Sequence, residues 1–288
     1  MVTPPASILT IISASSVPVG NVLQPQLQKP KMRSRQIRVF ILISISFLLF
    51  ASLFFIPRIP QPPDYHNFAD TRSWLGAPNF CNVVSNLPFA IFGAMGLLFL
   101  AKATANHSFL DPRERWPYFF FFLGLFLTSF GSGYYHWNPD NATLLWDRLP
   151  MTIAFMGIIA ALIAERIDVS VGISALAPLL FIGASSPIQW YFSELQGHGD
   201  LRFYAAVQAA AVLSLPFFLL LFPPRYSHSA DFAAVAAFYV LAKLFEIFDK
   251  QVFSVGHLIS GHTLKHLAAS LSGYWIFHML KLRRPVNT

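Results

Sequence analysis

Long apolar runs dominate the chain and predict an all-α polytopic membrane protein. Each run approaches the 20 or so apolar residues that a helix needs to cross the hydrocarbon core of a bilayer. The runs are continuous instead of alternating between apolar and polar positions, which favours a helix bundle over a transmembrane barrel. The predicted spans lie at residues 39–56, 80–103, 117–136, 144–164, 171–192, 201–222, 231–249 and 262–281.

A Pro-rich segment at 57–63 separates the first run from the other seven. We therefore predict a seven-transmembrane helix bundle preceded by one extra N-terminal transmembrane helix. Residues 1–30 have no helical period, and the sequence does not distinguish a targeting segment from a disordered tail there. The predicted organisation is an N-terminal extension at 1–38, an anchor helix at 39–56, an extracytosolic linker at 57–79, a catalytic core at 80–282 and a cytosolic tail at 283–288.

The composition supports a membrane protein. Of 288 residues, 55% are hydrophobic and only 11% are charged, whereas soluble domains carry about 25% charged residues. Disordered chains and most soluble enzymes are excluded on this ground. The single cysteine also excludes a disulfide framework and a cysteine-based zinc site.

Basic residues indicate the orientation of the chain. The formal net charge is +7, and most Lys and Arg residues flank the apolar runs on one side of the predicted bundle. This bias places both termini in the cytosol, and in a eukaryote the endomembranes (ER or Golgi) are the expected location. Because topology accounts for the basic residues, we do not expect nucleic-acid binding. The sequence names no protein partner.

Polar residues inside the predicted spans are the candidates for chemistry, since ionisable groups in a bilayer are costly. Ser132 and His136 are four residues apart at the end of the third run, and therefore share one helical face. Asp147 follows early in the fourth run. His262 and His266 share a face at the start of the eighth, and such a pair can chelate one metal ion.

The predicted topology brings these residues to one depth near the outer membrane interface. A lone intramembrane histidine is usually a packing residue, and a lone Ser132 would be read as a small residue at a helix contact. Three imidazoles at one depth, however, match a catalytic zinc site with an open fourth position. We therefore predict one zinc ion bound by His136, His262 and His266.

Charged residues close to the predicted site have simpler explanations. Lys243 and Lys265 are expected to extend to the interface or to pair with nearby acids. Glu246 and Asp249 could contact histidine N–H groups, although a solvated helix end is the preferred interpretation of both.

The set of polar residues resembles the alkaline ceramidase family, in particular its alkaline phytoceramidase-like branch. The matching pattern is Ser-x-x-x-His at 132–136, an aspartate eleven residues later at 147, and His-x-x-x-His at 262–266. The Asn-rich segment 79–86 also resembles the start of the first core helix in that family. The resemblance covers roughly residues 64–282.

The resemblance implies a zinc-dependent amide hydrolase that converts ceramide or phytoceramide, taken from the bilayer, to a sphingoid base and a free fatty acid. It implies that Asp147 handles the proton and that Ser132 stabilises the oxyanion. Members of the family carry an acidic calcium-binding cluster before the first core helix. Asn79 stands here where a glutamate would be expected, so we do not predict a calcium site.

Three other functions fit parts of the pattern. A related hydrolase would keep the metal site and act on a different acylated lipid. A seven-helix receptor with a structural zinc would bind a ligand without turnover. A proton-coupled transporter would place charged groups at several depths and contain an internal repeat, and neither feature is evident.

Overall fold

The computed structural model describes residues 32–286, and these residues form helices and connecting loops with no β-strand among them. The all-α prediction is confirmed. The α-helices are α1 Met32–Ser52, α2 Phe80–Val84, α3 Leu87–Ala101, α4 Arg115–Trp137, α5 Asn141–Arg166, α6 Val169–Leu195, α7 Arg202–Leu221, α8 Asp231–Ile247, α9 Asp249–Ser254 and α10 Gly261–Leu282. Short 3₁₀ helices are η1 Pro63–His66, η2 Ala103–Ser108 and η3 Pro112–Glu114.

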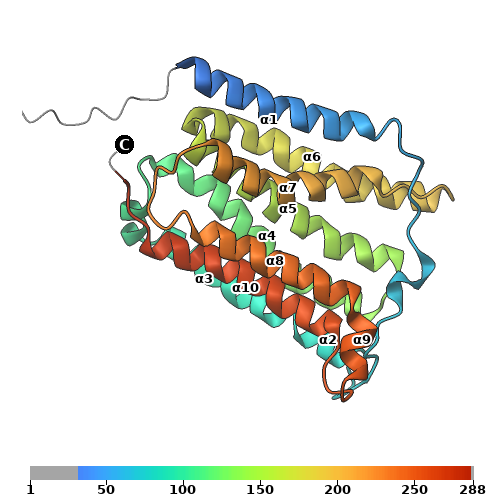
Figure 1. Ribbon diagram of the computed structural model, residues 1–288. Coiled ribbons are helices and arrows are strands. Elements are labelled where there is room, and N and C mark those ends of the chain that lie inside the picture. Colours follow the sequence, from blue (N-terminus) through green and yellow to red (C-terminus); the bar gives the residue numbers. More distant parts are fainter. Residues whose placement is uncertain (1–31, 287–288) are drawn as a thin grey trace, which may run out of the picture.

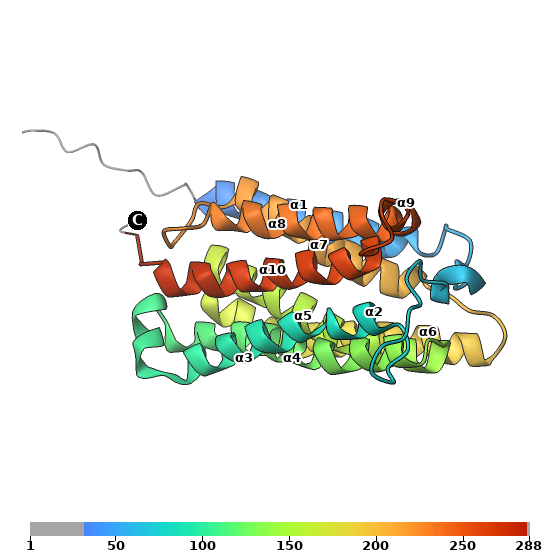
Figure 2. The same ribbon diagram turned by 90° about the horizontal axis from the view of Figure 1, so that it is seen from below.

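The long helices lie side by side along a common direction in two perpendicular views (Figures 1 and 2). Helix α4 packs between α3 and α5. Helix α5 also packs against α6 and α7, and α10 packs against α8 and α3. Helix α1 lies outside this group against α7. The start of α1 and the end of α10 lie at one end of the bundle, and α9 lies at the other (Figure 1).

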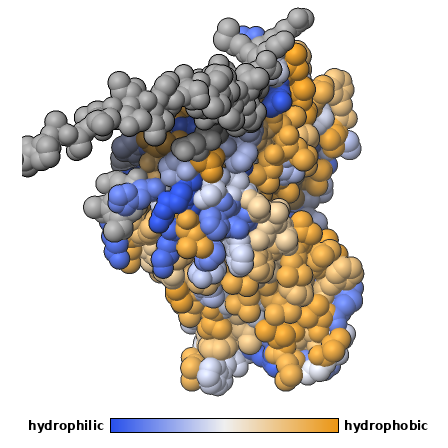
Figure 3. All heavy atoms as spheres, turned by 60° about the vertical axis from the view of Figure 1, so that its left-hand side comes forward, coloured by the Kyte–Doolittle hydropathy of each residue, from blue (hydrophilic) through white to orange (hydrophobic). Residues whose placement is uncertain are grey.

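Among residues 32–286, five helical segments are long and apolar enough to cross a membrane, as expected of a membrane protein. Broad apolar surface covers the side of the bundle, while hydrophilic surface gathers near one end (Figure 3). Helix α8, with 17 residues, and the more polar α4 and α10 fall outside this set, so the number of eight spans stays a prediction. The five are Ser34–Ser52, Phe80–Ala101, Asn141–Arg166, Val169–Leu195 and Arg202–Leu221.

The first helix differs from the prediction of 39–56, since it begins at Met32 and ends at Ser52. Arginine and glutamine are good helix formers, so the basic segment before residue 39 continues the helix. At the other end, Pro57 disfavours helical geometry in the residue before it. Residues 1–31 lie outside the described residues, so the predicted extension at 1–38 is described only in its last part, which is helical.

The predicted helix at 80–103 is interrupted at Ser85 and Asn86, between α2 and α3. Pro88 has no N–H to donate to the carbonyl of Val84, which explains a break at this point. The break lies within a membrane-length segment, and Ser85 is buried inside the bundle.

A capping box starts α5 and sets the position of Asp147. The Asp140 carboxylate accepts a hydrogen bond from the backbone N–H of Thr143 at 2.7 Å, and the Thr143 hydroxyl accepts one from the Asp140 N–H at 3.1 Å. Such a box satisfies N–H groups that the first turn of a helix leaves unpaired. Asp147 follows about two turns later on the buried side of α5.

A buried ion pair fixes the chain after α10. The Arg283 guanidinium pairs with the Glu165 carboxylate on α5, and both side chains are almost completely inaccessible. The Tyr118 hydroxyl donates to the same carboxylate at 2.7 Å. The predicted tail at 283–288 therefore begins inside the core, because Arg283 needs its partner away from water.

Replacing Arg283 by Met should destabilise the protein by about 3–5 kcal/mol, because it leaves the Glu165 charge buried without a partner. The double variant R283M/E165L should recover most of that loss. Thermal unfolding of the purified protein in detergent measures both effects. Equal stability of the single and double variants would contradict this role of the pair.

Candidate metal centre

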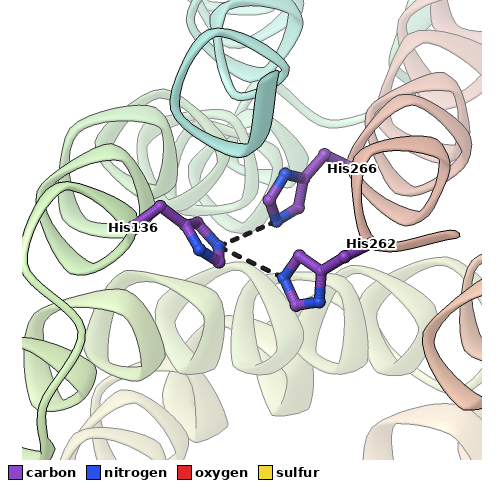
Figure 4. Close-up of side chains that lie close together, drawn as sticks. All are labelled: His136, His262 and His266. Atoms are coloured by element: carbon purple, nitrogen blue, oxygen red, sulfur yellow. Dashed lines mark hydrogen bonds between the residues drawn. The ribbon is translucent and has the colours of Figure 1, made fainter. Parts of the chain in front are cut away.

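Three buried histidines from two helices meet at one point, as Figure 4 shows. Nε2 of His136 lies 3.2 Å from Nε2 of His266 and 3.2 Å from Nε2 of His262. Ligand atoms of the three side chains all lie within 4.8 Å of one another. The predicted grouping of His136, His262 and His266 is confirmed, and this group could bind a metal ion.

The two distances from Nε2 of His136, 3.2 Å each, are close to the spacing of nitrogens around a tetrahedral metal ion. Zinc binds imidazole nitrogen at about 2.0–2.1 Å, so two nitrogens of a tetrahedral site are about 3.3–3.4 Å apart. A proton on Nε2 of His136 can be donated to only one of the two nitrogens that face this atom. The nitrogen without a hydrogen bond needs another positively charged partner, which is either a metal cation or a nearby ammonium.

Helix ends place the three rings. His136 lies in the last turn of α4. His262 and His266 lie in the first turns of α10, which starts where the Ser260 hydroxyl accepts a hydrogen bond from the N–H of Thr263 at 3.1 Å. Because residues i and i+4 share a helical face, the two α10 rings both point toward α4.

Ser85 selects the ring nitrogen that His266 presents to the cluster. The Ser85 hydroxyl donates to the carbonyl of Asn82 at 3.1 Å. Its oxygen also lies 2.7 Å from Nδ1 of His266 and therefore accepts that N–H. With the proton on Nδ1, Nε2 carries the lone pair that a metal ion requires.

Asn79 and Asp249 hold the other two histidines through the backbone. The Asn79 amide donates to the carbonyl of His136 at 2.9 Å. The Asp249 carboxylate accepts a hydrogen bond from the backbone N–H of His262 at 2.7 Å. Phe68 packs over the rings of His136 and His262, with centroids 4.6 and 4.7 Å apart, and shields the cluster from water.

Sequence reasoning did not identify Ser85, Asn82 or Phe68 as site residues. Asn82 joins α2 to the start of α10, because its side-chain amide oxygen accepts hydrogen bonds from the hydroxyl groups of Thr263 at 2.9 Å and Ser260 at 3.4 Å. The usable signal was the pair of Asn82 and Ser85, two polar residues inside an apolar run. No local pattern marks Phe68, since its ring reaches the site from a loop.

Asp147 and Ser132 lie together, as their predicted shared depth requires. The side chain of Ser132 lies beside the Asp147 carboxyl group. Both residues and His266 line one cavity of about 330 Å³. The structure therefore brings all five predicted site residues to one region, with His136 and His262 behind the cavity wall. The chemical roles of Asp147 and Ser132 stay predictions.

Lys265 pairs with an acid, in agreement with one of the two predicted alternatives. Its ammonium lies 3.0 Å from one Glu246 oxygen, and the Lys243 ammonium lies 2.5 Å from the other. Lys265 also lies 3.2 Å from Nε2 of His262, so it is the ammonium that could compete with a metal ion for this lone pair.

The preferred interpretation of Glu246 and Asp249 as a solvated helix end is wrong. Glu246 lines the cavity between two lysines. The Asp249 carboxylate is shared by the backbone N–H groups of Ala69 and His262, at 2.9 and 2.7 Å. Asp249 thus connects the linker before α2 to the start of α10.

An ion pair in the linker braces the same end of the bundle. The guanidinium of Arg72 binds the buried carboxylate of Asp70 at 2.7 Å. Arg72 also donates to the carbonyls of His257 and Leu258 at 2.9 and 2.8 Å. Hydrogen bonding by Arg72 lowers the pKa of Asp70 below its ordinary value.

Comparison of the sequence with protein-family models and with curated proteins gave no match.

Replacing Ser85 by Ala should weaken metal binding about 10–100-fold, the usual effect of removing a partner that orients a ligand. His266→Ala should abolish binding. Metal content of the purified variants after dialysis against graded chelator measures both. Ser193→Ala is a matched control, because the Ser193 hydroxyl bonds the Trp190 carbonyl and backbone N–H of Asp200, outside the cluster. Unchanged affinity in Ser85→Ala would contradict the assigned contact.

The Asp70–Arg72 pair should stabilise the protein in a pH-dependent way. Because the folded pKa of Asp70 lies below the unfolded value of about 3.9, its contribution is complete above about pH 5 and disappears as the pH falls through the folded pKa. The difference in thermal unfolding between the native protein and Asp70→Asn should therefore be constant near neutrality and shrink below about pH 4. A difference that grows on acidification would contradict this.

Proposed function

We propose that the protein is a zinc-dependent integral-membrane hydrolase that cleaves the amide bond of ceramide or phytoceramide. The convergence of three imidazole nitrogens beside a cavity that Asp147 and Ser132 line carries the proposal. Two further supports are the membrane character of the helices and the resemblance of the five residues to the alkaline ceramidases.

Zinc fits the donor set, since neutral imidazoles are common ligands of this ion. When bound, zinc would supply Lewis acidity, which lowers the pKa of a bound water to about 7 and polarises a carbonyl. His136, His262 and His266 would hold it. The other residues would complete the chemistry from the cavity side.

Asp147 is assigned the proton transfers. Its carboxylate accepts the proton from the attacking water and then delivers it to the nitrogen of the leaving amine. The net reaction consumes one water and gives a carboxylic acid and an amine. The carboxyl group lines the cavity beside Ser132, so the proton acceptor is already in place.

Ser132 is assigned the stabilisation of the negative charge on the former carbonyl oxygen. A donor of this kind is worth about 3–4 kcal/mol in the transition state. The Ser132 side chain lines the same cavity as Asp147, so one substrate carbonyl can lie within reach of both.

The cavity suits a lipid. Its lining is mostly apolar and includes Phe121, Leu125, Met151 and Phe155, which can pack against hydrocarbon chains. Polar groups gather at Asp147, Ser132 and the lysine–glutamate cluster. An amphipathic substrate that enters from the bilayer can place its amide beside Asp147 with its chains along the apolar wall.

Location and orientation are part of the proposal. The two ends of the described chain lie at the same end of the bundle (Figure 1), which agrees with both termini on one side of the membrane. We assign this side to the cytosol, with the metal centre at the opposite end, in ER or Golgi membranes of a eukaryotic cell.

Asp147→Asn should retain zinc and lose at least about 100-fold of the turnover, because an amide cannot accept the proton. His266→Ala should lose zinc and turnover together. Thr128→Ala is the matched control, since this cavity hydroxyl bonds the Gly124 carbonyl of its own helix.

The assay is release of fatty acid from ceramide, dihydroceramide and phytoceramide in detergent micelles, followed by mass spectrometry. Full activity of either variant would contradict the assignment. Turnover only in a total lipid extract would identify a hydrolase of another acylated lipid. Binding of lipid without turnover would point to a receptor with a structural metal.

A further inference from the structure

A second cavity lies at the opposite end of the bundle from the metal centre. Its volume is about 510 Å³, and it opens between the last turns of α3, the end of η2 and the last turns of α10. Hydrophilic surface gathers near this end of the molecule (Figure 3). The cavity has no part in the proposed hydrolysis, so any function of its own is independent of that proposal.

Three cations surround this cavity. Lys102 follows the last residue of α3, Lys281 lies in the last turn of α10, and Arg284 lies just beyond it. All three side chains are exposed. Among residues 32–286, no acidic side chain lines the cavity or forms an ion pair with Lys102 or Lys281. The positive charge at this cavity is therefore available to bind an anionic ligand.

Three other arginines near the same end of the bundle are neutralised. Arg113 pairs with Asp111 at 2.8 Å, Arg225 pairs with Glu114 at 3.3 Å, and Arg283 pairs with Glu165. The Arg284 guanidinium forms no ion pair among residues 32–286, and its Nη1 donates to the Arg283 carbonyl at 3.0 Å. This contact holds the guanidinium in place beside the cavity.

The wall of the cavity is apolar on the side of the helices. Leu98, Phe99 and Phe277 line it, and Leu98 is 64% exposed. These residues precede the helix ends by less than two turns, so they lie at the edge of the hydrocarbon region, while the cations lie at headgroup depth. A ligand that fits both parts has an anionic head and an apolar body.

We propose that this cavity binds the headgroup of an anionic phospholipid. The phosphate would lie among Lys102, Lys281 and Arg284, and the acyl chains would follow Leu98 and Phe277 along the outside of α3 and α10. Basic pockets between transmembrane helices bind lipid headgroups in this way. A soluble phosphate would meet the same cations but would gain nothing from the apolar wall.

The test is native mass spectrometry of the full chain, delipidated in detergent and titrated with dioleoyl phosphatidic acid, phosphatidylserine or phosphatidylcholine. The two anionic lipids should bind more tightly than phosphatidylcholine. The triple variant K102Q/K281Q/R284Q should lose roughly fivefold in affinity for each charge removed, or about 100-fold in all.

A matched triple variant removes the same charge elsewhere. R38Q/R58Q/K250Q should change the affinity by no more than about twofold, because none of these cations lines the cavity and charges farther away than a Debye length are screened. Size-exclusion elution and thermal unfolding should be native-like for both triple variants. An equal loss of affinity for the anionic lipids in the two triple variants, or no loss of affinity in K102Q/K281Q/R284Q, would overturn the proposal.

A further arm separates a lipid from a soluble anion. Leu98→Gln should weaken phospholipid binding, and excess inorganic phosphate should not displace the phospholipid. Displacement by inorganic phosphate, together with unchanged lipid binding in Leu98→Gln, would identify a soluble anion site and would overturn the assignment to a lipid.

Discussion

Three imidazole nitrogens held close together away from water need positive charge between them. In this protein Nε2 of His136 faces two other Nε2 atoms at 3.2 Å, and lone pairs that face one another in an apolar interior repel strongly. A proton can bridge one of these pairs of nitrogens, and the Lys265 ammonium can donate to Nε2 of His262. A divalent cation can bind all three nitrogens at once. The arrangement of the helix ends around the site follows from keeping these rings together.

Breaks and caps do most of this positioning. Pro88 interrupts the first core helix and leaves Ser85 facing His266, while Ser260 caps α10 and points two histidines toward α4. Asp249 and Asn82 then tie α10 to the linker and to α2. The site therefore depends on where helices start and stop.

The sequence was sufficient to predict the helices, which follow from repeated apolar runs, and the histidine cluster, whose members lie at one depth in the membrane. Apolar runs predicted the helices, and the spacing of His262 and His266 placed both on one face. Topology then brought His136 to the same end, and the structure groups all three. The start of α1 was misplaced, because arginines at a helix end carry a helical preference that hydropathy does not report. The role of Phe68 was out of reach, since it depends on the path of a loop. Arg283 was assigned to a tail, because a charged residue after a helix gives no sign of a buried partner on α5.

The central claim is that His136, His262 and His266 hold one divalent metal ion. X-ray absorption spectroscopy of the purified full-length protein tests it most directly. The account predicts one zinc per chain with imidazole nitrogens at about 2.0–2.1 Å, and a signal of this kind that disappears in His266→Ala. Protein purified without chelator that contains no bound metal, or a metal whose ligands include no imidazole, would contradict it.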